Sequence, residues 1–91
     1  MRKIQRKKKF LNDLARSGRP DFIDEIDSIL YFLQRDGELH ESYDAHPLFW
    51  QWAGFWDVHL DDDWILVYRI TAKKIRLIRL VRHQQLRESK P

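Results

Sequence analysis

The chain has 91 residues, of which 43% are hydrophobic and 34% charged, and its formal net charge is +3 at pH 7. This length predicts one domain, spanning residues 1–91, and the apolar content predicts a folded chain. Cysteine is absent, which excludes disulfides and thiolate metal sites. No apolar run approaches the ~18 residues of a membrane span. Polar residues also interrupt the segment after the basic N-terminus, where a signal peptide needs an unbroken apolar stretch, so we expect a cytoplasmic protein.

The charges are segregated along the chain. Residues 1–20 contain eight Lys/Arg and one acidic residue, residues 21–63 contain one Arg and twelve acidic residues, and residues 64–91 again contain eight Lys/Arg and one acidic residue. If the two ends of the chain meet in the fold, they form one basic surface opposite an acidic one. Such a field attracts and orients a polyanion. The alternative is a set of ordinary solvated charges.

The first part of the chain predicts a short strand and two helices. Residues 2–6 predict an edge strand that its basic side chains protect. Apolar residues recur on one helical face from Lys7, and Gly18 and Pro20 end that helix. A second helix begins near Asp21 and ends at Asp36-Gly37. The short turn between them predicts an antiparallel helical hairpin.

The rest of the chain predicts an ordered loop over residues 38–51 and then three strands. Phe55–Leu60, Trp64–Thr71 and Lys74–Arg82 have strand character, and their short connections predict an antiparallel meander. Each helix has one apolar stripe to bury, so both should cover the same face of the sheet. The sequence therefore predicts an α+β fold of order β-α-α-β-β-β, with residues 87–91 as a flexible tail.

Histidine, aspartate and arginine gather around the predicted strands. His59 and Asp63 flank one turn, and His83 directly follows the last strand. RNA carries its own nucleophile, because its 2′-OH attacks the adjacent phosphorus when a base removes the proton and an acid protonates the leaving 5′-oxygen. Histidine serves in either role near neutral pH, and arginine stabilises the charge on the phosphorane. These residues predict a nuclease that needs no metal and no other cofactor.

Four motifs, in this order, resemble the YafQ branch of the RelE/ParE toxin superfamily. They are Asp44-Ala-His46-Pro47-Leu48, Trp52-Ala-Gly54-Phe55-Trp56-Asp57-Val-His59, Asp63-Trp64-Ile-Leu-Val-Tyr68-Arg69 and Arg79-Leu-Val-Arg82-His83. The resemblance covers roughly residues 7–86. It implies a curved antiparallel sheet and the toxin of a type II toxin–antitoxin system, which acts as a ribosome-dependent mRNA endoribonuclease. Such toxins cut mRNA in the ribosomal A site without a metal, and a cognate antitoxin neutralises them.

The resemblance also implies the site residues. The implicated positions of the YafQ branch match His46, His59, Asp63, Trp64, Arg79 and His83 of this chain. Our hypothesis makes His83 the general acid and either His59 or Asp63 the general base. His46 is then a second base or a donor that orients the substrate.

Arg79 is the predicted phosphorane stabiliser. By strand alternation it shares a face with Ile75, Leu77 and Val81, and an arginine on an apolar face needs a partner or a cleft. A shared hollow holding Arg79 and the three imidazoles is the arrangement that the hypothesis requires.

The remaining predicted site residues bind substrate. Trp64 would stack on a base or form a wall of the site. Phosphate contacts are predicted for Arg69, Arg76, Arg82, Lys7, Lys8 and Lys9. Packing in the core or loop is the favoured role of Trp50, Trp52, Phe55 and Trp56, rather than a nucleotide platform. The expected partners are mRNA and ribosomal RNA in the A site, and an antitoxin whose acidic segment covers the basic surface.

One departure from the family keeps alternatives open. Family members close with an aromatic residue just after the last histidine, and that residue helps to position a base near the scissile bond. Here the chain continues from His83 with Gln-Gln-Leu86-Arg87. A catalytically inactive member, or a ParE-like member that acts by binding DNA gyrase, is therefore the alternative, although the paired histidines argue against the ParE-like one. The chain lacks the His-x-x-x-His spacing that would favour a metal hydrolase.

Overall fold

The computed structural model describes residues 1–91 and confirms the predicted α+β class. Its helices and strands are β1 (Lys3–Arg6), α1 (Lys8–Ser17), α2 (Asp21–Gln34), β2 (His46–Pro47), β3 (Trp56–His59), β4 (Trp64–Ile70) and β5 (Lys74–Arg82). Short 3-10 helices are η1 (Glu41–Tyr43), η2 (Trp50–Trp52) and η3 (His83–Glu88). No helix is long and apolar enough to cross a membrane.

The five strands form one sheet in the order β1-β5-β4-β3-β2. The expected meander is present, since β3, β4 and β5 pair antiparallel in sequence. The sheet is mixed rather than purely antiparallel, because β1 pairs parallel with β5. The helical hairpin between β1 and the rest carries the chain back, which allows this parallel pairing. The two-residue strand β2 adds His46 and Pro47 to the other edge.

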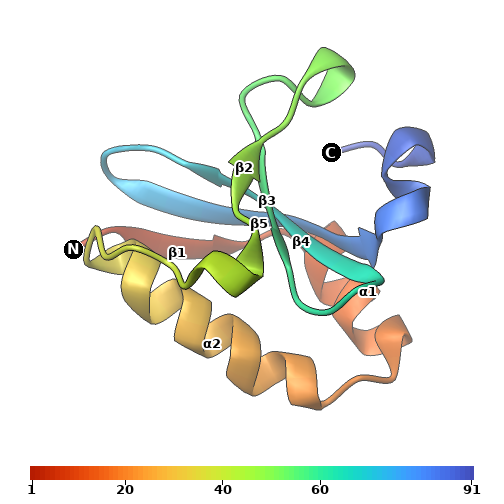
Figure 1. Cartoon of the computed structure of the whole chain (residues 1–91), viewed down its shortest axis with the longest axis horizontal. Coiled ribbons are helices and arrows are strands. Elements are labelled where there is room, and N and C mark those ends of the chain that lie inside the picture. The colour runs from red at the N-terminus through yellow and green to blue at the C-terminus, as the bar shows by residue number, and fades with distance from the viewer.

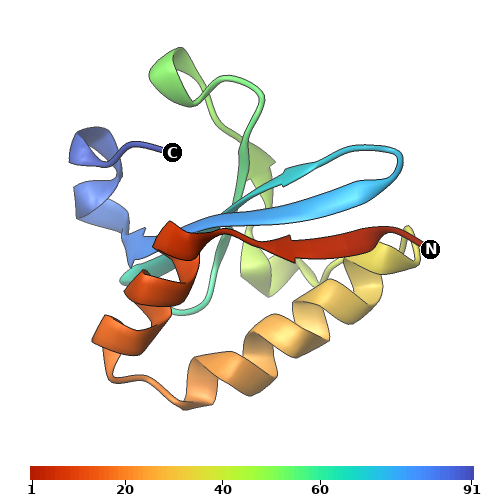
Figure 2. The ribbon, with the colours of Figure 1, turned by 180° about the vertical axis from the view of Figure 1, so that it is seen from behind.

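Both helices lie below the sheet, and the loop after β2 and the η3 segment lie above it (Figures 1 and 2). The helix side holds the larger core, where Phe10 of α1 and the stripe of α2 pack against the sheet. Helix α1 ends at Gly18, whose φ of +65° is a left-handed conformation that glycine adopts without strain. The 13 buried members of this core are Phe10, Phe22, Ile26, Ile29, Leu30, Leu33, Val58, Leu60, Leu66, Tyr68, Ile75, Leu77 and Leu80.

The upper face of the sheet carries a smaller core and holds the functional candidates. Trp52 packs there on Ile65, Val67, Ile78 and Val81. The Trp52 indole Nε1–H donates to the carbonyl of Leu86 at 3.1 Å, which ties the loop after β2 to η3. The loop and η3 are therefore joined above the sheet.

A β-bulge decides which face Arg79 occupies. Tyr68 of β4 pairs with Leu77, but the next residue, Val67, pairs with Arg79, so Ile78 is the extra residue of β5. The alternation of side chains between the two faces of the sheet is therefore shifted by one residue after Ile78. Arg79 lies on the same face as Val81, opposite the helices. The prediction that Arg79 shares a face with Ile75 and Leu77 is wrong for this reason.

The C-terminal segment contacts the body of the protein. Residues 87 and 88 belong to η3, whereas the sequence predicts a flexible tail from residue 87. Lys9 donates to the carbonyl of Pro91 at 3.0 Å, and Arg79 donates to that of Lys90 at 2.9 Å. These contacts place the last residues beside α1 and β5.

Candidate active site

Three imidazoles from distant parts of the chain lie side by side on the upper face. The ring centroid of His59 is 6.1 Å from that of His46 and 5.5 Å from that of His83. Backbone pairing explains this, because His46 faces Asp57 in the β2–β3 ladder and the His83 amide donates to the Asp63 carbonyl at 2.7 Å. The predicted convergence of residues 46, 59 and 83 is therefore present.

A buried carboxylate lies beneath the rings. Asp57 is only 1% exposed, and its Oδ1 is 3.0 Å from Nδ1 of His46. Burial raises the pKa of the Asp57 carboxyl above its ordinary value, and the nearby imidazoles of His46, His59 and His83 only partly offset this. When ionised, this carboxylate places negative charge directly beneath the imidazoles.

Backbone contacts fix the tautomer of His46. Its Nδ1 lies 2.8 Å from the carbonyl oxygen of Asp44 and 3.0 Å from Asp57 Oδ1. Both neighbours accept and neither donates when Asp57 is ionised, so Nδ1 carries the hydrogen. It donates to the carbonyl, and Asp57 Oδ1 is left without a well-aligned hydrogen bond. In the neutral ring the lone pair is therefore on Nε2, which can accept a proton.

Two buried side-chain atoms without a hydrogen-bond partner, Asp57 Oδ1 and His59 Nδ1, lie at the candidate site. The third such atom, Arg76 Nε, belongs to β5, opposite Arg69 of β4. His59 Nδ1 lies 3.7 Å from the carboxylate of Asp44, beyond hydrogen-bond range. Since folded proteins pair nearly all such atoms, the two beside the imidazoles are consistent with a site that holds a ligand or carries a reaction.

Asp63 and Trp64 are placed differently from the prediction. The Asp63 carboxylate forms an ion pair with Arg82, and Arg82 also lies over the Trp64 ring, 5.0 Å from its centroid. Trp64 packs edge-on against Phe22 of α2, so it is on the helix side of the sheet. The Asp63 side chain is therefore engaged by Arg82, and Trp64 lines the cavity that holds Arg79 instead of bordering the imidazoles.

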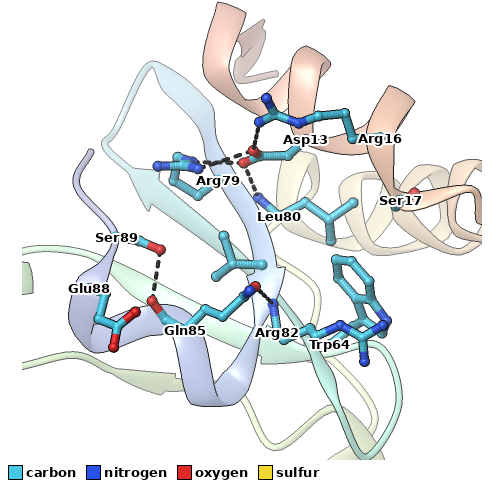
Figure 3. A pocket seen from close by; sticks show the side chains of 11 residues that line it. Asp13, Arg16, Ser17, Trp64, Arg79, Leu80, Arg82, Gln85, Glu88 and Ser89 are labelled. Atoms are coloured by element: carbon cyan, nitrogen blue, oxygen red, sulfur yellow. Dashed lines mark hydrogen bonds and ion pairs between the residues drawn. The ribbon is translucent and has the colours of Figure 1, made fainter.

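Arg79 is also separated from the imidazoles. Val67 of β4 lies between it and Asp57 in the sheet register, so it stands two strands from β3. Its guanidinium donates to Asp13 of α1, at 2.7 Å from Nε and 3.0 Å from Nη2 (Figure 3). The expected hollow shared by Arg79 and the three rings is therefore not present, because Asp13 is the partner that the arginine requires.

Asp13 itself links α1 to the open edge of β5. Strand β1 covers β5 only as far as Leu77, and the Leu80 amide beyond it donates to Asp13 at 3.0 Å. Burial raises the pKa of the Asp13 carboxyl, but the hydrogen bonds from Arg79, Leu80 and Arg16 outweigh burial and leave it lowered. Arg79, Asp13, Arg16, Arg82 and Gln85 line a cavity of about 520 Å³ on this side of η3 (Figure 3).

Most of the predicted phosphate contacts share one groove. Lys7, Lys8, Lys9, Arg69 and Arg76 line a cavity of about 330 Å³ with Phe55 and Ile78. Arg69 and Arg76 are directly opposite on β4 and β5, an arrangement of like charges that an anion would relieve. The two basic ends of the chain therefore meet here, which is the condition under which their charges were expected to form one basic surface. Arg82 lies outside this basic groove, with Asp63.

Asp57 is the site residue that the sequence did not single out. The signal was present, because Asp57 and His59 are two residues apart and so lie on the same face of a strand. Its burial was not predictable, since it depends on the smaller core of the upper face. No group of three or more His, Cys, Asp or Glu side chains is arranged to hold a metal ion.

Comparison with known proteins gives a family match over nearly the whole chain. The model of the bacterial toxin of type II toxin–antitoxin systems, YafQ, matches residues 2–88. A curated relative, the mRNA interferase toxin YafQ of Escherichia coli K12, is 43% identical over 48 residues. That alignment covers 53% of this chain and 52% of the relative, so it spans about half the length of the relative.

Solved structures match over most of the length of both chains. YafQ in the E. coli DinJ–YafQ complex superposes with a TM-score of 0.80 at 30% identity, over 94% of this chain and 98% of that one. A metal-bound toxin from Helicobacter pylori superposes with a TM-score of 0.81, also at 30% identity, over 94% and 99%. The fold and the order of its elements are thus those of these toxins.

Proposed function

Because the chain belongs to the YafQ family of bacterial toxins of type II toxin–antitoxin systems, we propose that it is an endoribonuclease that cuts mRNA on the ribosome. The observation that carries this proposal is the row of three imidazoles above the buried Asp57 carboxylate. Each ring is reachable from solvent to some degree, with His83 exposed and His59 the least exposed of the three. The reaction is attack by the 2′-OH on the adjacent phosphorus, which gives a 2′,3′-cyclic phosphate and a free 5′-OH.

We assign the general base to His46 and the general acid to His83. The Nδ1–H of His46 donates to the Asp44 carbonyl, so its Nε2 is free to take the proton of the 2′-OH. Asp57 stabilises the imidazolium that forms, as a buried carboxylate does beside a catalytic histidine. This assignment differs from the sequence-based choice of His59 or Asp63 as the base, with His46 only a second base or an orienting donor; the Asp63 carboxylate is engaged by Arg82. His83, exposed at the start of η3, protonates the leaving 5′-oxygen.

His59, between the other two rings, would donate to a non-bridging oxygen of the phosphorane. This differs from the sequence-based assignment of that role to Arg79. Neighbouring strands are about 4.8 Å apart, so Arg79 stands about 10 Å from β3. We assign Arg79, held in orientation by Asp13, to a neighbouring phosphate of the RNA. Proton transfer by a well-placed group typically supplies ~10²–10⁴-fold in rate.

The basic groove would hold the RNA backbone and contact ribosomal RNA. Its five Lys and Arg side chains provide sequence-independent attraction that weakens with salt. The same groove suits an acidic segment of a cognate antitoxin, and the related E. coli toxin is known in complex with DinJ. Neutralisation would follow because one surface cannot bind both. The proposed site of action is the cytoplasm, where mRNA is translated.

The test is to induce the protein without an antitoxin and to map breaks in a reporter mRNA, with and without its start codon. We expect growth arrest and breaks only in the translated mRNA, and neither effect with His83→Ala. Growth arrest with intact mRNA would instead favour a ParE-like action on gyrase. Absence of arrest at normal protein levels would favour a catalytically inactive member.

A further inference from the structure

Trp50 is exposed to an extent that packing does not explain. It is 90% exposed, and its neighbour Phe49 is 68% exposed, although the sequence favours packing for the tryptophans of this loop. Trp50 also has a φ of +59°, which is strained for a bulky residue with a Cβ. An aromatic ring this exposed buries little surface, and its strained backbone makes the residue a candidate for binding a ligand rather than for packing.

The loop holds this indole in place. Gln51 donates to the Arg87 carbonyl at 3.3 Å, and Trp52 donates to that of Leu86 at 3.1 Å. The Ala53 amide donates to the carbonyl of Trp50 itself at 3.0 Å and closes the η2 turn. The backbone of Trp50 is therefore anchored on its C-terminal side while its ring remains free.

The ring borders a cavity that includes the proposed general acid. This cavity of about 640 Å³ lies between the loop and η3, and its walls include Phe49, Trp50, His83, Gln84 and Arg87. Aromatic faces, one cation and amide groups are the chemistry that recognises an unpaired base with its phosphate. Glu88, also in the wall, is the one acidic group there, and it would accept a hydrogen bond from an amino group of a base.

We propose that Trp50 is a stacking platform for the nucleobase next to the scissile phosphate, with Phe49 beside it. The inference rests on the proposed function, because it is His83 in the wall of the cavity that places the scissile bond there. The chain has no aromatic residue after His83, and Trp50 supplies an aromatic ring at this cavity from the opposite wall. Trp50 thus positions the substrate and takes no part in proton transfer.

RNA is favoured over a protein as the occupant for a reason visible in the same cavity. His83 lies in the wall, and if it protonates the leaving 5′-oxygen, the nucleotide attached to that oxygen must lie in this cavity. An indole face stacks on any base, so Trp50 mainly positions the nucleotide and has only a small effect on sequence preference.

The experiment compares Trp50→Gly, Trp50→Phe and Tyr31→Ala in a purified translation system with a reporter mRNA. Glycine removes the ring and relieves the positive φ, so misfolding cannot explain a loss. Tyr31, on α2, is an exposed aromatic residue far from the cavity and serves as the control. We expect Trp50→Gly to lower kcat/KM by about 5- to 150-fold, the range of one base–aromatic stack, mainly through KM. Trp50→Phe should remain within about threefold of wild type, because a smaller aromatic face still stacks.

His83→Ala in the same assay separates the two claims. Suppose that wild type cuts and His83→Ala does not. If Trp50→Gly then cuts like wild type with the same base preference, Trp50 is not a stacking platform, and the proposed function stands. A Trp50→Phe variant as impaired as Trp50→Gly also overturns stacking. Normal cutting by Trp50→Gly with loss of neutralisation by the antitoxin would assign the surface to a protein instead. If wild type cuts no translated mRNA, both claims fall.

Discussion

Replacing Asp13 with asparagine should destabilise the protein strongly without touching the imidazoles. The Asp13 carboxylate accepts two hydrogen bonds from Arg79, one from Arg16 and one from the Leu80 amide. Asparagine keeps the shape but removes the charge, and it leaves a mostly buried guanidinium without its anion. Breaking a fully buried pair costs about 3–5 kcal/mol. Because 16% of the Arg79 side chain is exposed, we expect about 2–3 kcal/mol.

Urea unfolding at pH 7 measures this loss, and for a domain of this size it corresponds to a fall in Tm of roughly 10–20 °C. The exposed Asp27→Asn on α2 is the control and should stay within about 0.5 kcal/mol. The Asp13 pKa is lowered in the folded state, so the wild-type advantage is present above its ordinary value of 3.8 and disappears as the pH falls through the lowered pKa. A difference below about 0.5 kcal/mol at pH 7, or one that persists at low pH, would refute the reasoning.

Asp57→Asn should lower activity without lowering stability. We expect cleavage to fall about tenfold or more, because the His46 imidazolium loses its anion. Burial raises the pKa of the Asp57 carboxyl, so the ionised carboxylate opposes folding above that pKa. The variant should therefore be at least as stable as wild type in urea unfolding at pH 7. A clearly lower free energy of unfolding for the variant would contradict this. Arg69→Ala and Arg76→Ala should each weaken RNA binding uniformly across sequences and flatten its salt dependence, measured by filter binding, while a sequence-specific effect would count against a phosphate role. Cleavage should continue when a chelator removes transition metals while Mg²⁺ is kept high enough to hold the ribosome together, and a loss of cleavage there with translation intact would revive a transition-metal mechanism.

The sequence predicted the parts of the fold that local pattern controls. Gly18 and Pro20 placed the end of α1, and the alternation of β4 and β5 gave the meander. The parallel pairing of β1 depends on contacts between the two ends of the chain, which no local pattern records. The bulge at Ile78 is likewise a property of the pairing between β4 and β5, which the local pattern of β5 does not record.

The candidate site was predictable to the same degree. The resemblance implied His46, His59 and His83 as site residues, and the hypothesis required them to converge; strand pairing does bring them to one region. Arg79 was misplaced because a single extra residue reverses the face of everything after it. Asp57 and Trp50 were missed because their burial and exposure are properties of the assembled upper face.

The central claim is that His46 and His83 act as base and acid in RNA cleavage. The most direct measurement uses an mRNA with sulfur in place of the 5′-bridging oxygen at one scissile bond, presented on a programmed ribosome. A thiolate leaves without protonation, since a thiol is far more acidic than an alcohol. We predict that His83→Ala, inactive on normal mRNA, cuts this substrate near the wild-type rate, whereas His46→Ala does not. Equal impairment of His83→Ala on both substrates, or wild-type activity of either variant on normal mRNA, would contradict the account.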